Sequence, residues 1–195
     1  MTKEALEIIK KTDIRSLDAQ LALRCAPFIA GLKPSNLLIT DKTQADALNT
    51  LLKETRFSSF LLYECHTKMT VLLYAHPLLD DFINSPNVRK ILYQQGYANA
   101  ALQNLLKTFA ARYQDYMQRK TEFPHEMGLF LGYPPEDVEG FIANKGKNCI
   151  YAGYWKVYAN PLEKMYLFQK FDQAKEALLR LSAQGFRMCD LLKYA

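Results

Sequence analysis

Two segments of the chain concentrate the residue types that could do chemistry, and the first runs from residue 24 to residue 36. It contains a thiol, Cys25, together with Lys33 and Asn36, and these three side chains are candidates for ligand binding. A nucleophilic thiol needs a cationic neighbour or a helix N-terminus. Cys25 instead falls on an apolar stripe toward the end of a predicted helix, where the helix dipole disfavours a thiolate. The sequence therefore favours a core thiol over a reactive one.

The second segment, residues 123–158, contains the candidate acid–base group, His125. This choice rests on elimination, because the other two histidines lie in a predicted turn and at the end of a predicted strand. Glu126 or Glu122 would be the carboxylate that orients the imidazole in an enzyme. The alternative is a structural histidine bonded to a neighbouring carbonyl group. The sequence leaves open whether the protein is an enzyme.

Metal and cofactor motifs are incomplete along the sequence. His125-Glu126 begins a zinc-protease motif, but Leu129 stands where the second histidine is required. Cys65 and His66 are adjacent, and adjacent strand residues point to opposite faces, so they form a poor chelate. The glycine-rich nucleotide motifs and the nucleophile elbow of hydrolases are absent from the sequence. We therefore predict no metal site, and the sequence leaves the cofactor unknown.

Basic and aromatic residues alternate toward the end of the second segment. This mixture suits a site that binds an anion and stacks rings, but it is more typical of a half-buried strand. If residues 151–158 form one strand, its side chains alternate between two faces. Trp155 and Val157 then face inward, whereas Tyr154, Lys156 and Tyr158 face outward. The candidate ligand-binding residues of this segment are Tyr133, Lys147, Tyr154, Lys156 and Tyr158.

Hydrophobic spacing predicts the elements that must position these residues. Apolar residues recur at helical steps from Ile14 to Phe28, from Leu102 to Met117 and from Leu167 to Leu181. Two apolar runs, 60–65 and 69–75, flank a short polar turn and predict a β-hairpin. The further predicted elements are a strand at 36–40, a helix at 45–52 and two short helices within 123–146.

These elements predict the α+β class, or an irregular α/β arrangement, in a single globular domain over residues 1–195. A small three- to four-stranded sheet, which includes the hairpin, packs with several long helices. The chain can bury a sizeable core, because 49% of its 195 residues are hydrophobic. The long apolar stripes are therefore interpreted as core faces rather than cofactor-binding surfaces.

Composition and charge argue against several classes of protein. No run approaches about 18 apolar residues, so no membrane span is expected, and the N-terminal stretch shows no apolar core of a secretory signal. The four cysteines lie dozens of residues apart, which favours reduced thiols. We therefore expect a soluble cytoplasmic protein. Nucleic-acid binding is disfavoured, because the net charge of +5 is spread along the chain and the predicted helix 135–144 begins with three carboxylates.

Both segments resemble a bacterial family of unknown function, found mostly in anaerobes. The matching residues of the first segment are Cys25-Ala26-Pro27, Ala30-Gly31, Lys33-Pro34 and Asn36-Leu37. Those of the second are His125-Glu126, Gly128, Phe130-Leu131-Gly132-Tyr133-Pro134, Asp137-Val138 and Gly140-Phe141, followed by Asn144-Lys145-Gly146 and a Gly153–Tyr158 block. Arg24 departs from the pattern, since many relatives are expected to have histidine there. The resemblance implies no reaction, cofactor or catalytic residue.

The concentration of polar and aromatic residues in two segments leads to the main functional expectation. We expect a small-molecule-binding protein, with enzymatic activity left open, whose pocket is formed by residues 25–36 and 123–158. The identity of the ligand stays unknown from the sequence.

The alternative expectation is a protein–protein interaction module. It would dock through the acidic helix 135–144 and the aromatic strand 151–158. The exposure of Tyr154 and Trp155, with their neighbour Tyr151, distinguishes the two. A flat, exposed aromatic surface favours docking, whereas a concave, half-buried one favours a ligand.

Overall fold

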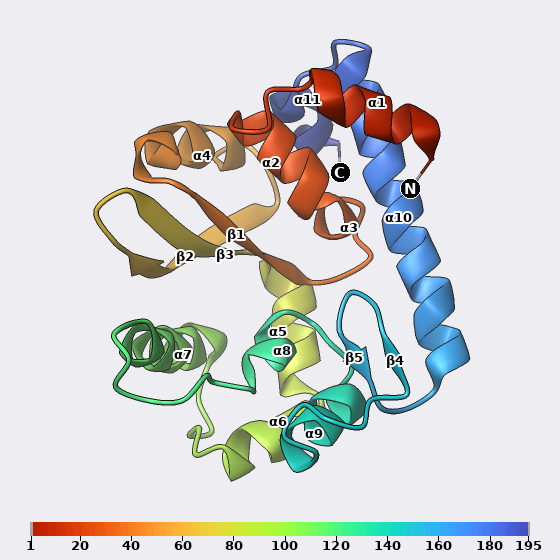
Figure 1. Cartoon of the computed structure of the whole chain (residues 1–195). Coiled ribbons are helices and arrows are strands. Elements are labelled where there is room, and N and C mark those ends of the chain that lie inside the picture. Colours follow the sequence, from red (N-terminus) through yellow and green to blue (C-terminus); the bar gives the residue numbers. More distant parts are fainter. Residues whose placement is uncertain (1, 195) are drawn as a thin grey trace.

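The computed structural model describes residues 2–194, and a small antiparallel sheet lies at its centre (Figure 1). The strands are β1 (Ser35–Asp41), β2 (Phe57–Glu64) and β3 (Lys68–Ala75), in the spatial order β1-β3-β2. The central strand β3 is buried on both faces, which explains its nearly continuous apolar sequence. The predicted α+β class and the small sheet are confirmed.

The hairpin formed by β2 and β3 is confirmed as well. Its strands pair from Phe57 opposite Ala75 to Glu64 opposite Met69, with a bulge between Leu61 and Tyr63. The backbone amide of Cys65 donates to the carbonyl of Lys68 at 2.9 Å and closes the short turn.

Each face of the sheet supports its own hydrophobic core (Figure 1). Leu73 of β3 belongs to one core and Leu72 to the other, because successive strand residues point to opposite faces. The first core contains residues of α1 (Lys3–Lys11), α2 (Leu17–Arg24), α3 (Ala26–Ile29), α4 (Ala45–Leu52), α10 (Pro161–Ala183) and α11 (Met188–Lys193). The second contains residues of α5 (His76–Asn84), α6 (Pro86–Gln94), α7 (Leu102–Met117), α8 (Met127–Phe130) and α9 (Pro135–Ala143). Within residues 2–194, no helix combines the length and apolar character needed to cross a membrane.

The helix predicted as continuous from Ile14 to Phe28 is two helices, α2 and α3. Ser16 caps α2, since its hydroxyl accepts the backbone amide of Ala19 at 3.3 Å, and Ile14 lies before the helix. Pro27 lacks an amide hydrogen, so the helical hydrogen-bond ladder cannot continue through it. Cys25 therefore lies at the junction of the two helices.

The aromatic strand predicted at 151–158 is also interrupted. It forms a hairpin of two short strands, β4 (Tyr151–Ala152) and β5 (Lys156–Val157), and Gly153 donates to the carbonyl of Trp155 at 3.0 Å in the turn. A side chain at Gly153 would lie 2.3 Å from the ring of Phe168 on α10, so only glycine allows this close approach. Trp155 and Val157 nevertheless face inward as predicted, because both are buried against α10.

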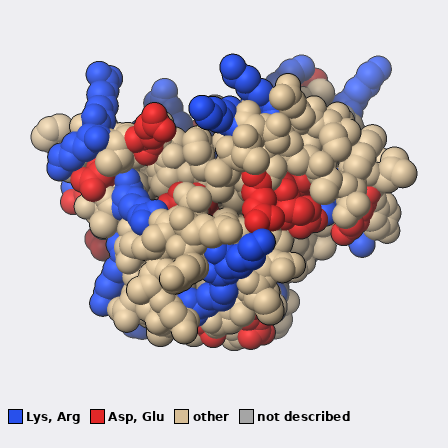
Figure 2. Space-filling model, turned by 90° about the horizontal axis from the view of Figure 1, so that it is seen from below, with Lys and Arg blue, Asp and Glu red and all other residues tan. Residues whose placement is uncertain are grey.

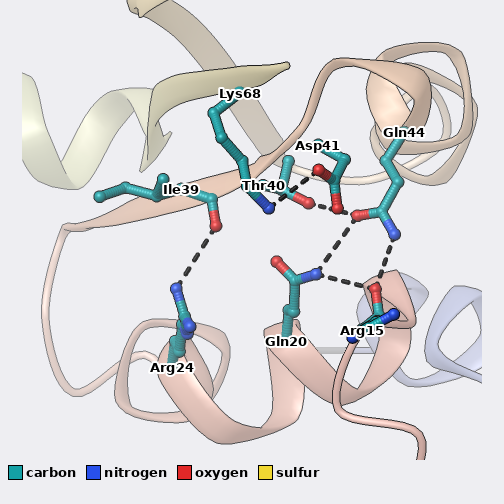
Figure 3. Close-up of polar contacts among 8 residues, drawn as sticks. All are labelled: Arg15, Gln20, Arg24, Ile39, Thr40, Asp41, Gln44 and Lys68. Atoms are coloured by element: carbon teal, nitrogen blue, oxygen red, sulfur yellow. Dashed lines mark hydrogen bonds and ion pairs between the residues drawn. The ribbon is translucent and has the colours of Figure 1, made fainter.

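Polar side chains hold α2 against the edge strand β1 and the 3₁₀ helix η1 (Lys42–Gln44) that follows it (Figure 3). The side-chain amides of Gln20 and Gln44 both donate to the carbonyl of Arg15, at 2.9 and 2.8 Å. The guanidinium of Arg24 donates to the carbonyl of Ile39 at 3.4 Å. These contacts cover part of an otherwise open sheet edge.

Candidate functional site

A cavity of about 340 Å³ lies beside α8, α9 and the β4–β5 hairpin. Its wall is mainly apolar, with Met127, Leu131 and Val138 among the aliphatic residues. Apart from tyrosines, three of the lining residues have charged or titratable side chains, namely His125, Asp137 and Lys156. The aromatic residues of the wall are Phe123, His125, Tyr133, Phe141, Tyr154 and Trp155.

The turn between α8 and α9 brings both sides of this wall together. Gly132 has φ +72°, a left-handed conformation that favours glycine. A side chain there would lie 2.4 Å from the ring of Pro34, so the turn packs directly on the segment after α3. Pro135 begins α9 at a position where a missing amide hydrogen costs nothing. The two short helices therefore reverse sharply around the cavity.

His125 lines the cavity between two other rings. Its centroid lies 5.7 Å from that of Phe123 and 5.2 Å from that of Phe141. The Nδ1 atom is buried and has no hydrogen-bond partner among residues 2–194. Buried polar atoms without a partner are uncommon in folded proteins and call for an explanation. His125 is therefore the most distinctive polar group of the site.

Glu126 is directed away from His125. Its carboxylate accepts hydrogen bonds from the hydroxyl of Tyr97 and the guanidinium of Arg112, both at 3.0 Å. The guanidinium also lies 4.4 Å from the centre of the Tyr97 ring. Burial, and then the Glu126 charge, raise the pKa of the Tyr97 hydroxyl. Glu126 thus anchors α8 to α7, and the structure does not bring it to His125; Glu122, the other suggested carboxylate, is exposed.

Asp137 holds several parts of the site together, a role that the sequence did not predict, since it marked this residue only as one acid of a predicted helix and as part of the family pattern. Its buried carboxylate accepts the indole Nε1–H of Trp155 at 2.7 Å. It also accepts the backbone amides of Tyr158 at 2.7 Å and Ala159 at 3.1 Å. Tyr133 then stacks on Trp155 with centroids 4.7 Å apart. No local pattern separates Asp137 from the neighbouring acids, because its partners lie about twenty residues later.

The cavity brings Tyr154 and Lys156 of the hairpin together with His125 and Tyr133. The Tyr154 hydroxyl donates to the Asp172 carboxylate at 2.9 Å. Burial and this carboxylate raise the pKa of the Tyr154 hydroxyl, so the phenol stays protonated.

The ammonium of Lys156 donates to the carbonyl of Gly146 at 2.7 Å and lies 5.8 Å from the Phe141 ring. Two of the ligand-binding residues predicted in the second segment are not part of the wall. Lys147 is exposed outside it, and Tyr158 lies beyond Phe141 with a buried hydroxyl that has no partner among residues 2–194.

Cys25, Lys33 and Asn36 form a cluster behind the wall. The Asn36 amide donates to the Cys25 sulfur at 3.3 Å and accepts from the Lys33 ammonium at 3.2 Å. Burial raises the pKa of the Cys25 thiol to about 12, and loss of solvation lowers the pKa of Lys33 to about 8. The burial of Cys25 agrees with the core thiol that the sequence favoured.

The two predicted segments therefore meet, but they do not share the cavity lining. The Lys33 ammonium lies 5.2 Å from the centre of the Tyr133 ring, so the first segment packs on a residue of the wall. None of Cys25, Lys33 and Asn36 lines the cavity. The lining comes from residues 123–156, because Tyr133 and Trp155 form the wall on the side of the first segment.

Acidic and basic side chains are interspersed on the surface. Figure 2 shows one face on which acidic side chains gather between basic ones. Two of the basic side chains are paired with acidic ones, since Lys90 lies 3.7 Å from Glu139 and Arg112 is bound to Glu126. In the acidic helix α9, Glu136 is likewise bound to Lys164 at 2.8 Å.

Comparison with known proteins identifies the family. A family described as a protein of unknown function, DUF3793, matches residues 21–192, and the chain belongs to it. No curated protein matches the chain, and no solved structure does. The match covers both segments, the whole second core, and the first core apart from Ala5 and Leu17.

Proposed function

We propose that this member of the DUF3793 family binds a small organic molecule in the cavity beside α8, α9 and the β4–β5 hairpin. The observation that carries the proposal is the cavity itself, which is concave, mainly apolar and about 340 Å³ in volume, with aromatic side chains at half of its lining positions. Small-molecule sites are typically of this size and combine an apolar wall with a few polar groups.

The polar groups divide into satisfied and available ones. The carboxylates of Asp137 and Glu126 receive hydrogen bonds from within the protein and serve the fold. Lys156 forms one hydrogen bond to Gly146 with an ammonium that has three donors, and His125 lines the cavity with its ring, while its buried Nδ1 has no partner among residues 2–194. We assign ligand contact to these two side chains. If the ligand is turned over, His125 is the acid–base group, acting without an orienting Glu126.

The test is a thermal-shift screen against nucleotides, flavins, tetrapyrroles and acyl carriers. A ligand that binds only the folded state raises the unfolding midpoint as its concentration increases. Tyr154→Ala should weaken binding, because this ring lines the cavity.

Tyr151→Ala is the matched control. Tyr151 lies in the same hairpin, is 38% exposed against 39% for Tyr154, and also packs on Phe168, but it does not line the cavity. Loss of binding in Tyr154→Ala alone would support the proposal. Equal losses in both variants, or no ligand that shifts the midpoint, would contradict it.

An interaction module receives less support from the same surfaces. Trp155 is buried and Tyr154, although 39% exposed, lines a concave wall, so Tyr151 is the one of the three rings that is exposed outside the cavity. The carboxylates of α9 are engaged within the chain, since Asp137 is buried and Glu136 and Glu139 contact lysines. We also propose a cytoplasmic location, which agrees with the four free cysteines.

A further inference from the structure

The aromatic residues of the cavity form two separate rows. In one row, His125 contacts Phe123 and Phe141, with centroids 5.7 and 5.2 Å apart. In the other, Tyr133 stacks on Trp155 at 4.7 Å. Both rows line the same cavity, and within residues 2–194 no ring contact joins one row to the other. A cavity lined by two such rows suits a ligand with a flat ring system. The ligand ring can pack against the side chains of each row, either face to face or edge to face.

The charged groups of the cavity are not equivalent. Asp137 is buried, and three N–H donors at 2.7 to 3.1 Å already compensate its carboxylate. Lys156 has no carboxylate partner among residues 2–194 and is exposed at the wall. Its single hydrogen bond to the Gly146 carbonyl leaves donors for a ligand. The cavity therefore offers a free positive charge, whereas its negative charge is occupied.

A cationic ligand fits this arrangement less well than an anionic one. Aromatic faces attract cations, but the Lys156 ammonium already lies 5.8 Å from the Phe141 ring. A second cation would be repelled by Lys156, and the nearby Lys145 and Lys147 are also exposed. An anionic group of a ligand would instead accept a charge-assisted hydrogen bond from the Lys156 ammonium.

We propose, resting on the function proposed above, that the cavity takes a planar aromatic molecule that carries an anionic group. The ring system lies between the row of His125 and the row of Trp155. The anionic group meets the ammonium of Lys156 at the exposed side of the wall.

Isothermal titration of the full chain with four related probes tests this assignment. The probes are 2-naphthoate, the neutral naphthalene-2-carboxamide, the cationic 2-naphthylmethylammonium and the non-planar decahydronaphthalene-2-carboxylate. We expect 2-naphthoate to bind about tenfold more tightly than each of the other three, since charge and planarity both contribute. Lys156→Gln should weaken 2-naphthoate about tenfold and leave the carboxamide within about twofold.

Lys147→Gln is the control, because this lysine is exposed and does not line the cavity. Equal binding of the carboxamide and 2-naphthoate, or equal effects of the two lysine variants, would overturn the assignment of an anion while leaving the cavity as a binding site. Tighter binding of the decahydro compound would overturn the planar ring. If none of these probes binds but a compound of the thermal-shift screen does so in a Tyr154-dependent way, only the present assignment fails. If neither experiment shows binding, the proposed function fails with it.

Discussion

At the scale of single residues, Asp137 shows how one side chain supports a site that it does not serve chemically. Its carboxylate joins the start of α9 to the indole of Trp155 and to the backbone after β5. Buried carboxylates are costly unless they are fully hydrogen-bonded. The three donors meet this requirement, so the position of the Trp155 ring depends on Asp137.

Replacing Asp137 by Asn should therefore destabilise the protein through one contact in particular. The Asn oxygen can still accept the two backbone amides, but its NH₂ group would face the indole N–H, donor against donor. We expect a loss of about 2 to 3 kcal/mol in the free energy of unfolding, measured in urea.

A double-mutant cycle isolates this contact. Trp155→Phe removes the indole donor, so Asp137→Asn should cost at least about 1 kcal/mol less in that background. Glu139→Gln is the control on the same helix and should change stability by less than about 0.5 kcal/mol, because its side chain is 48% exposed. Additive losses in the double mutant would show that the indole bond is not the cause.

Lys33 gives a prediction for the dependence of stability on pH. Loss of solvation lowers the pKa of Lys33 from 10.5 to about 8 in the folded protein. Below pH 8 the lysine is charged in both states, and the cost of burying the charge is fully present. Between about pH 8 and 10.5 the folded state releases a proton that the unfolded state retains, so this cost disappears as the pH rises.

The stability of the wild type relative to Lys33→Met should therefore increase by about 2 to 3 kcal/mol from pH 7 to pH 10.5, at about 1.4 kcal/mol per pKa unit. Urea unfolding of both proteins across this range measures the difference, and both proteins keep Cys25, whose thiol pKa burial raises to about 12 in the folded state. Lys53→Met, at an exposed lysine, is the control and should show a flat difference. A flat difference for Lys33→Met as well would refute the buried-charge interpretation.

At the scale of elements, the reversal between α8 and α9 depends on the contact of Gly132 with Pro34. Gly132→Ala should cost about 1 kcal/mol or more for the left-handed backbone and a further loss for the clash, since the new methyl group would lie 2.4 Å from Pro34. We expect at least about 2 kcal/mol in total by thermal or urea unfolding.

Gly185→Ala separates the two contributions. Gly185 also has a positive φ, +91°, but nothing lies within 4 Å of the added side chain. Gly185→Ala should therefore lower the free energy of unfolding only by the cost of placing alanine in a left-handed backbone conformation. If the two variants lose the same stability, the packing of the turn on Pro34 contributes nothing.

At the scale of the whole molecule, α10 connects the site to the rest of the fold (Figure 1). Its first half carries Phe168 and Phe171, which pack with Trp155, and its second half carries Leu178 and Leu179 of the first core. The second core packs directly on the other face of the sheet, and α8 is also tied to β1, because the Ser35 hydroxyl donates to the Phe130 carbonyl. The cavity wall is thus attached to both faces of the sheet.

The sequence alone determined those helices and strands that are encoded by the pattern of neighbouring residues. The hairpin of β2 and β3 and the helices α7 and α10 follow from apolar residues repeated at the period of a strand or a helix. Alternation also predicted the burial of Trp155 and Val157, although the strand itself is interrupted.

Only the tertiary structure decided which polar groups remain for a ligand. Helical spacing and charge do not distinguish Asp137 from Glu136 and Glu139, yet Asp137 is buried and bonded to Trp155, whereas the other two contact lysines from distant elements. Glu126 follows His125 directly but binds Tyr97 and Arg112, and Lys33 lies over the Tyr133 ring without lining the cavity. These outcomes depend on contacts between residues that are far apart in the chain. The periodicity of neighbouring residues gives no information about such contacts.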